Sequence, residues 1–253
     1  MRPETYQTLA DRQQTYWWHR ARRSMALSLL RRYGLASGCR WLDIGCGPGG
    51  NFSMLASLSP KLVAGIDISP IALSLARAYA PSAVLVRADI NETLPFADAS
   101  FDVATILNVL YHGWVRSEAD VLAEVARILR PGGLLLLTEP AFDALMREMD
   151  EAVMTRRRYR DADFDPWLRA AGFGTLFSSY FTAFGVPILL GAKFLKRLHR
   201  KTAAPQTALD MRPLPGLVNE TLAIIAKIEG WALTKRVRMP FGTTLVRVAR
   251  RLS

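Results

Sequence analysis

The sequence has little of the chemistry that disulfide-stabilised or metal-bound proteins need. Its 253 residues include two cysteines and three histidines. Cys39 and Cys46 stand seven positions apart, a spacing typical of neither a disulfide framework nor a zinc site. Residues 1–10 lack the apolar core of a signal peptide. We therefore expect a cytoplasmic protein without a bound metal.

Long apolar runs are also scarce. Residues 170–192 carry no charge and could in length cross a bilayer, but glycine, proline, serine and threonine recur among them. This mixture predicts a strand, a turn and the start of a helix instead of a membrane span. Because 50% of the residues are hydrophobic, the chain can still bury a sizeable core.

Acidic residues are few at both ends of the chain. Residues 1–34 carry a net charge of +5 and residues 186–253 carry +10, whereas residues 35–185 carry −4. Basic ends of this kind suit an anionic substrate, an anionic membrane surface or nucleic acid. A basic surface that serves only solubility is the alternative, and composition does not decide between them.

Apolar runs alternate with helical patterns from Arg40 onwards, which predicts an α/β fold with a parallel sheet. The expected strands are residues 40–44, 61–67, 83–87, 101–107, 134–139, 175–184 and 243–249. The expected helices are residues 4–33, 70–79, 118–129, a segment from 140 to 158, 161–171, 188–201 and 217–237. We predict three parts: an N-terminal helical lid (1–34), a Rossmann-like domain (35–186 with 239–253) and a helical insertion before the last strand (187–238).

A glycine-rich turn follows the first expected strand. Asp43, Gly45, Gly47 and Gly49 form the pattern D-x-G-x-G-x-G, in which glycine lets the backbone approach a ligand closely. Gly45, Gly47 and Gly50 also fit the dinucleotide pattern G-x-G-x-x-G. A carboxylate two residues before the first glycine disfavours a pyrophosphate but favours the ammonium and sulfonium of S-adenosylmethionine. Asp43 therefore indicates the latter cofactor.

Polar residues follow the next three expected strands. Asp67 ends the second strand and can accept hydrogen bonds from both ribose hydroxyls, a role it would equally have toward NAD. Asp89 and the apolar Ile90 follow the third strand and suit the amino group and ring of adenine. Asn108 follows the fourth strand.

From Trp41 to Gly133 the sequence resembles the type 11 methyltransferases, a family of class I S-adenosylmethionine-dependent methyltransferases. The matching features are the glycine turn, Asp67, Asp89 with Ile90, the Asn108 region and residues 129–133. The resemblance implies a seven-stranded sheet with an antiparallel last strand, S-adenosylmethionine as methyl donor and S-adenosylhomocysteine as product. It also implies that Asp43 and Gly45 lie near the methionine moiety and Asn108 beside the sulfonium. The expected cofactor-binding residues are Asp43, Gly45, Cys46, Gly47, Gly49, Asp67, Ile68, Asp89, Ile90 and Asn108.

Methyl transfer from a sulfonium requires alignment, and it requires a base only when the acceptor arrives protonated. His112, four residues beyond Asn108, is the expected base because an imidazole titrates near neutral pH. The alternative is a histidine that only bonds the backbone or packs a loop. Tyr111 and Glu139 are expected to orient the acceptor.

Two further segments are candidates for acceptor binding. His19 stands beside paired tryptophans in the expected lid. Arg157, Arg158 and Tyr159 belong to an arginine-rich run whose guanidinium groups suit a carboxylate or phosphate. The alternative for that run is an ion-pair network with the acidic residues Asp150, Glu151, Asp161 and Asp163.

The expected helix at 188–201 is amphipathic and basic, which suits either an anionic membrane surface or a cap over an apolar pocket; a helix simply packed on the domain is the alternative. We therefore expect methyl transfer to oxygen or nitrogen of a small apolar or lipid-like acceptor, with peripheral contact at the inner face of a membrane as an option. A nucleic-acid methyltransferase is disfavoured, since residues 108–111 lack the Asn/Asp-Pro-Pro-aromatic motif. A non-catalytic S-adenosylmethionine-binding protein and an NAD-dependent enzyme of similar topology are two further hypotheses.

Overall fold

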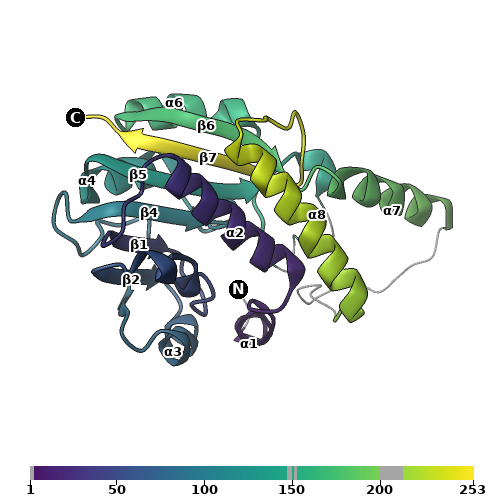
Figure 1. Cartoon of the computed structure of the whole chain (residues 1–253), viewed down its shortest axis with the longest axis horizontal. Helices are drawn as coiled ribbons and strands as arrows, with labels where there is room; N and C mark the ends of the chain where they lie inside the picture. Colours follow the sequence, from purple (N-terminus) through teal and green to yellow (C-terminus); the bar gives the residue numbers. More distant parts are fainter. Residues whose placement is uncertain (1–2, 147–149, 151–152, 200–212) are drawn as a thin grey trace.

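The computed structural model describes residues 3–146, 150, 153–199 and 213–253, and Figure 1 shows its course. The α-helices are α1 (Pro3–Arg12), α2 (Trp17–Arg32), α3 (Pro70–Tyr79), α4 (Glu118–Ile128), α6 (Phe164–Ala170), α7 (Gly185–His199) and α8 (Gly216–Thr234). The strands are β1 (Arg40–Ile44), β2 (Leu62–Asp67), β3 (Val84–Arg87), β4 (Phe101–Leu107), β5 (Leu129–Pro140), β6 (Phe173–Phe181) and β7 (Thr244–Arg251). Short 3₁₀ helices are η1 (Phe52–Leu58), η2 (Asp143–Leu145) and η3 (Asp161–Asp163).

The strands form one seven-stranded sheet in the order β3-β2-β1-β4-β5-β7-β6. Pairings among β1 to β5 are parallel, whereas β7 runs antiparallel to both β5 and β6. The predicted α/β fold with an antiparallel last strand is confirmed. The predicted bounds agree for β1 and β4, while β5 begins five residues early because Leu129 already pairs with Phe101.

Helices cover both faces of the sheet, as Figure 1 shows. The alternation of side chains along β5 separates the two layers: Leu135 and Leu137 pack with α4 and α6, whereas Leu134 and Leu136 pack with α2, η1 and α8. Side-chain caps begin two of the helices. The side chain of Ser69 accepts from the backbone amide of Ala72 at the start of α3. The side chain of Ser117 accepts from the backbone amide of Asp120 at the start of α4.

The N-terminal segment differs from the prediction of one helix over residues 4–33. It forms two helices, because Tyr16 adopts an extended conformation and the Asn219 side chain accepts from the amide of Trp17. The joint between them lies on the glycine turn, where Gln13 donates to the carbonyl of Pro48 at 3.2 Å and Gln14 to that of Gly50 at 3.4 Å.

The helix predicted from residue 140 to residue 158 does not run through that whole range. In the described residues after β5 the chain forms η2, Asp150 is helical, and residues 155–160 form no helix. Two isolated bridges hold that segment: Thr155 pairs with His112, and Tyr159 pairs with Ala141. The segment is therefore held by backbone hydrogen bonds to the ends of β4 and β5, which compete with helix formation.

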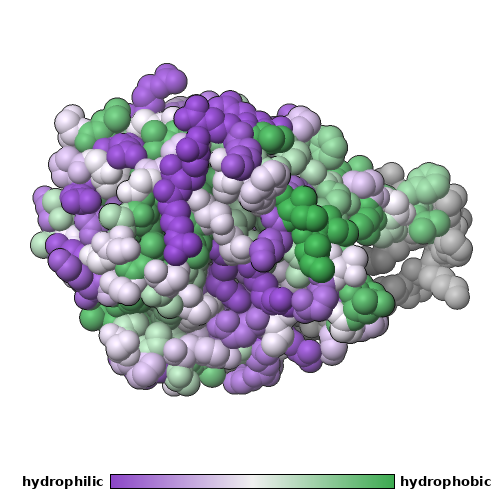
Figure 2. Space-filling view, in the orientation of Figure 1, coloured by the Kyte–Doolittle hydropathy of each residue, from purple (hydrophilic) through white to green (hydrophobic). Residues whose placement is uncertain are grey.

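The insertion contains α7 and α8, close to the predicted helices; the end of the first predicted helix, residues 200–201, lies outside the described residues. As predicted for residues 170–192, β6 is followed by a turn and by α7. In the described parts of the chain, the helices are too short or too polar to cross a bilayer. Figure 2 shows hydrophobic side chains at the surface over α8 and along α7.

Candidate active site

A cavity of about 440 Å³ opens at the carboxyl ends of β1, β2, β4 and β5. In a parallel sheet this edge is where ligands bind, because the loops after adjacent strands diverge there. Of the residues expected to bind the cofactor, the cavity is lined by Gly45, Cys46, Gly47, Asp67, Ile68, Asp89, Ile90 and Asn108. Of the residues expected to act on the acceptor, it is lined by His19, Tyr111, His112 and Arg158.

The first two glycines of the turn lie at the cavity and differ in the space around them. Gly45 has a φ of +68°, and a Cβ placed on it would lie 2.4 Å from Cγ2 of Val109. Gly47 has a φ of +53° and faces the cavity, and a Cβ placed on it would meet no described atom within 4 Å. Gly49, although part of the motif, packs on Ala76 of α3 and does not line the cavity. The first two glycines therefore expose backbone to a ligand.

Asp67 stands at the end of β2 beside the glycine turn. Its carboxylate accepts from the amide of Gly47 at 3.0 Å and from that of Ser69 at 2.9 Å. Burial raises the pKa of Asp67, and these two amides oppose the rise. Asp89 accepts from the side chain of Asn91 at 2.7 Å. Both carboxylates line the cavity from neighbouring strand ends.

Asp43 does not itself line the cavity but lies directly behind Asn51, which does. It is fully buried and accepts from Thr105 Oγ1 at 2.6 Å and from Asn51 Nδ2 at 3.0 Å. Burial raises its pKa to about 6. Asn51 does line the cavity, so Asp43 acts on the site by orienting that side chain.

Arg22 of α2 is a cavity residue that the sequence analysis missed. Its guanidinium donates to the side chain of Asn108 at 2.9 Å and to that of Asn51 at 3.2 Å, and it stacks over the ring of Trp18. The side chain is buried, and burial lowers its pKa to about 10, so it remains cationic at neutral pH. Arg22 stands four residues after Trp18 and three before Met25, so it lies within an otherwise apolar stripe of the helix. This spacing is visible in the sequence.

Asn108 holds a left-handed backbone conformation with a φ of +64°. Its side-chain oxygen accepts from Arg22 and from Thr138 Oγ1. Its backbone N–H donates to the backbone carbonyl of Thr138 at 2.7 Å. Asparagine tolerates this conformation better than most residues. The contacts fix the turn that carries residues 109–112 over the cavity.

His112 lies between two aromatic rings, with centroids 4.0 Å from Tyr111 and 3.9 Å from Trp114. Its Nδ1 donates to the carbonyl of Val153 at 2.8 Å, which leaves Nε2 as the acceptor nitrogen of the neutral ring. Burial lowers the pKa of His112 to about 3. The imidazole is therefore neutral throughout the physiological range.

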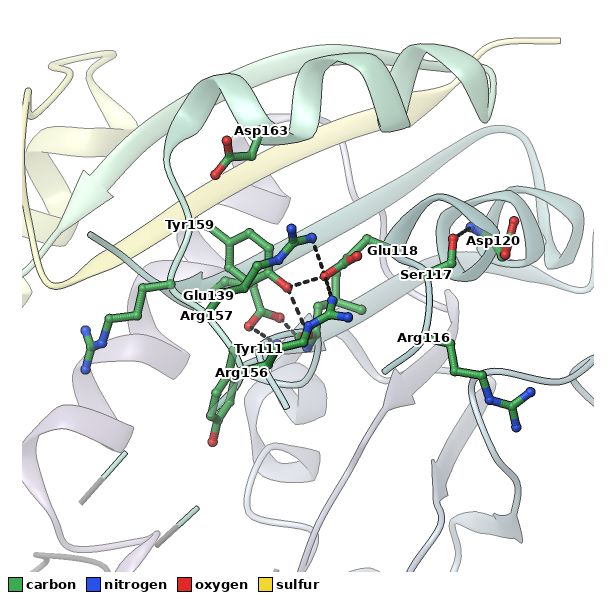
Figure 3. A network of polar contacts seen from close by, with 12 residues as sticks. Tyr111, Arg116, Ser117, Glu118, Asp120, Glu139, Arg156, Arg157, Tyr159 and Asp163 are labelled. Carbon is green, nitrogen blue, oxygen red and sulfur yellow. Dashed lines mark hydrogen bonds and ion pairs between the residues drawn. The ribbon is translucent and has the colours of Figure 1, made fainter. Parts of the chain in front are cut away.

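Glu139 does not reach the cavity, although the sequence suggested that it orients the acceptor. It is fully buried, and its carboxylate accepts from the amides of Val109, Leu110 and Tyr111 at 3.1, 2.9 and 3.2 Å. Figure 3 shows these contacts beneath the loop, with the Tyr111 hydroxyl directed away from them. Burial raises the pKa of Glu139 to about 8, against the effect of the three amides. Its role is to hold the loop that carries Tyr111 and His112.

Arg157 and Tyr159 also lie outside the cavity, in the network of Figure 3. Glu118 at the start of α4 accepts from Arg156 and Arg157, each at 2.5 Å, and from the Tyr159 hydroxyl at 2.7 Å. The same hydroxyl contacts the carbonyl of Leu110 at 2.8 Å. Burial opposes ionisation of Glu118, but the bonds from Tyr159 and Arg157 outweigh it and lower the pKa. This part of the arginine run is an ion-pair network, with an acidic partner that the sequence analysis did not name.

Arg158 and His19 do reach the cavity. Arg158 is buried, and its Nη2 contacts both carboxylate oxygens of Asp150 at 2.9 Å. This ion pair is the one that the sequence analysis gave as the alternative to acceptor binding. His19 is buried beside Trp18, with ring centroids 5.0 Å apart. Burial lowers the pKa of His19 well below its ordinary value.

The residues present fit S-adenosylmethionine. The buried Nε of Arg22 has no hydrogen-bond partner within the part of the chain that the structure describes, and it belongs to a side chain that lines the cavity. An anionic group such as the methionine carboxylate would satisfy it. The open space at Gly47 and the carboxylates of Asp67 and Asp89 complete a site with donors at one end and acceptors at the other.

Comparison with known proteins supports the same cofactor. Residues 42–137 match the family model of a methyltransferase domain. The chain is 32% identical over 164 residues to the trans-aconitate 2-methyltransferase of Methylobacterium nodulans, covering 58% of this chain and 62% of that protein. It is 42% identical over 106 residues to phthiotriol/phenolphthiotriol dimycocerosates methyltransferase 1 of Mycobacterium ulcerans, covering 41% and 38%.

Among solved structures, a chain from the complex of a Haloferax volcanii methyltransferase with the Trm112 methyltransferase activator matches with a TM-score of 0.63 and 20% identity, covering 98% of this chain and 94% of that one. This likeness shows the shared fold. The chain spans between 34% and 62% of the length of the first curated relatives it matches. Residues 42–137 thus match a methyltransferase domain and the sheet shares the fold of solved methyltransferases, in agreement with the class I S-adenosylmethionine-dependent methyltransferase that the sequence predicted; S-adenosylmethionine is the cofactor that these similarities imply.

Proposed function

We propose that this protein transfers the methyl group of S-adenosylmethionine to oxygen or nitrogen of a small apolar or lipid-like acceptor. The observation that supports this most directly is the composition of the cavity beyond the cofactor residues. Apart from the cofactor residues, the lining includes Trp17, Trp18, Phe184, Ile188, Leu189 and Leu222, with Thr182, Thr243, Thr244 and the Arg158–Asp150 pair as polar members. Apolar walls of this kind favour an apolar acceptor, since they offer few partners to a polar one.

The cofactor supplies an activated methyl group on its sulfonium; the protein supplies position. Asp67 suits the ribose hydroxyls, Asp89 with Ile90 suits adenine, and Arg22 suits the methionine carboxylate. Residues 3–16 act in this proposal as a lid over the glycine turn, and Gln13 and Gln14 hold it there. A lid of this kind excludes water from the reacting groups.

His112 is proposed to contact the acceptor through Nε2. Because its Nδ1 is engaged by Val153 and its pKa is about 3, the ring accepts a hydrogen bond and orients the acceptor, while it is a weak base. Tyr111 is proposed to assist from the same loop. Its hydroxyl is directed away from the network below it (Figure 3), and burial raises its pKa, so the hydroxyl stays protonated.

This role predicts a particular pH profile. An ordinary histidine base would make kcat/KM fall about tenfold per pH unit below about pH 6.5. With the lowered pKa of His112, we expect no fall that depends on His112 down to about pH 4.5, within the range where the protein stays folded. His112→Ala should lower kcat/KM by roughly tenfold to 100-fold at all these pH values. An inflection near pH 6.5 that disappears in this variant would instead establish a proton-accepting imidazole.

The proposed activity is tested with the full chain and two cofactors. Isothermal titration is expected to show micromolar binding of S-adenosylhomocysteine and no binding of NADH at about 100-fold higher concentration. Radiolabelled S-adenosylmethionine with panels of fatty acids, phenols, polyprenyl compounds and transfer RNA should then label an apolar acceptor. Labelling of RNA alone would replace this proposal with a nucleic-acid methyltransferase, and cofactor binding without labelling of any class would favour a non-catalytic binding protein.

A further inference from the structure

The outer side of α8 presents a row of exposed apolar side chains. Leu217, Ile224, Ile228 and Trp231 follow one another at intervals of seven, four and three residues, so they lie on one side of the helix. Their exposed fractions are 82%, 57%, 62% and 62%. We name these four residues the α8 apolar face, and Figure 2 shows hydrophobic residues gathered over this helix.

The fold does not need this surface for its own packing. The opposite side of α8 already buries Ala226, Gly230 and Leu233 against α2 and the sheet. A Cβ on Gly230 would lie 3.1 Å from Cβ of Met25, so the two helices are in close contact there. A helix with one buried side is expected to carry polar residues on the other. An exposed apolar stripe on that side marks an interaction surface.

A different side of α8 contributes to the cavity wall. Leu222 of α8 and Ile188 of α7 line the cavity, and Ile188 is at the same time 60% exposed. Phe194 on α7 is 63% exposed and Phe241, before β7, is 48% exposed. Both helices that contribute to the cavity wall therefore also carry exposed apolar side chains.

The exposed charges around the α8 apolar face are mostly basic. Lys227, Lys235, Arg236 and Arg238 are exposed beside it, and Nζ of Lys235 lies 5.6 Å from the ring centroid of Trp231. A tryptophan with a neighbouring lysine is suited to the boundary between acyl chains and headgroups.

The acidic groups of this region are already engaged. Between residues 213 and 253 the acidic residues are Glu220 and Glu229. Glu220 pairs with Arg20 at 2.5 Å, and Glu229 is buried and accepts from the amide of Ala183. The rim is therefore complementary to anionic headgroups. A second copy of the chain, packed face to face, would bring like charges together, which is unfavourable.

We propose that the α8 apolar face, with its basic rim, binds the surface of an anionic lipid bilayer. The apolar side chains enter the region below the headgroups, while Lys227 and Lys235 contact the headgroups. The surface differs from the basic side of α7, which the sequence alone suggested. The proposal does not depend on methyl transfer, since bilayer binding is measured without turnover.

The test uses the full chain and sedimentation with vesicles. Vesicles of phosphatidylglycerol and phosphatidylcholine are expected to bind the protein at least about tenfold more strongly than vesicles of phosphatidylcholine alone. Replacing the face by Leu217→Ser, Ile224→Ser, Ile228→Ser and Trp231→Ser should lower binding by about tenfold or more. Lys227→Glu with Lys235→Glu should lower it on the anionic vesicles only.

The matched control removes exposed apolar residues elsewhere. Ile71→Ser with Val84→Ser changes residues of α3 and β3 that are 42% and 46% exposed, and it should leave vesicle binding unchanged. S-adenosylhomocysteine titration confirms that each variant is folded. The proposal is overturned if the wild type does not bind anionic vesicles or if the fourfold variant binds them equally well. It is also overturned if sedimentation velocity shows a wild-type dimer that this variant dissociates, without vesicle binding.

Discussion

Arg22→Met is expected to raise the dissociation constant for S-adenosylhomocysteine by about 100-fold, because a charged hydrogen bond to a buried anion contributes roughly 2–3 kcal/mol. The guanidinium is buried, lines the cavity and has a side-chain nitrogen, Nε, without a hydrogen-bond partner within the described residues. Its other nitrogens are bonded to Asn51 and Asn108, so the group is held in place before a ligand arrives. Isothermal titration measures the effect.

Two variants separate this role from a general loss of structure. Arg20→Met lies on the same helix but removes a surface ion pair with Glu220, and it should change the affinity less than about twofold. Arg22→Lys keeps the charge without the planar donor group and should recover only part of the affinity. If Arg22→Met binds S-adenosylhomocysteine as the wild type does, Arg22 is not the partner of its carboxylate.

Glu139→Ala is expected to lower the free energy of unfolding by at least about 3 kcal/mol, since three buried amides lose their acceptor. These amides belong to Val109, Leu110 and Tyr111. The variant should therefore also weaken the loop that carries His112, and hydrogen exchange of the three amides should accelerate. Urea denaturation at a single pH measures the loss of stability.

The Glu139 carboxyl should also make the free energy of unfolding decrease as the pH rises. Its pKa is about 8 in the folded protein, above the ordinary value, so the folded state holds a proton that the unfolded state has released. The unfolding free energy should fall as pH rises from about 7 to about 8, by less than roughly 1.4 kcal/mol per unit. Below about pH 7 the fall is offset, because His19 and His112 are neutral in the folded state but take up protons in the unfolded state near their ordinary pKa.

Glu139→Gln is the matched variant for this dependence. An amide cannot titrate, so the fall in stability between about pH 7 and about pH 8 should disappear. One amide oxygen remains as an acceptor, and the loss of stability should be smaller than in Glu139→Ala. A wild-type slope that persists unchanged in Glu139→Gln would mean that another group causes it.

Local pattern was sufficient to predict the sheet and to bring the expected cofactor residues to one edge of it. Strands β1 and β4 and helix α3 have strong periodicity and clear boundaries, so their bounds agree with the prediction. The glycine turn, Asp67 and Asp89 follow consecutive strands, and parallel strands bring their carboxyl ends to one edge. The positions of these residues in the sequence therefore determine that they line one cavity.

The acceptor end was less predictable, because it depends on contacts between distant segments. Arg157 pairs with Glu118, 39 positions earlier at the start of α4, and no local pattern links them. For Glu139 a local signal was present. It alternates with Leu135 and Leu137, which face α4 and α6, so it points to the side of the sheet opposite Arg22. Residue type suggested a ligand-binding role, whereas strand alternation indicates a structural one.

Because residue 230 is glycine and has no side chain, it affects the size of acceptor that the proposed site can accommodate. Gly230 lets α8 approach Met25 of α2, and Leu222, about two turns earlier on the same helix, forms part of the cavity wall. The separation of the two helices therefore limits the width of the chamber beside the reacting methyl group. Relatives with a bulkier residue at this position would hold α8 further out and admit broader molecules.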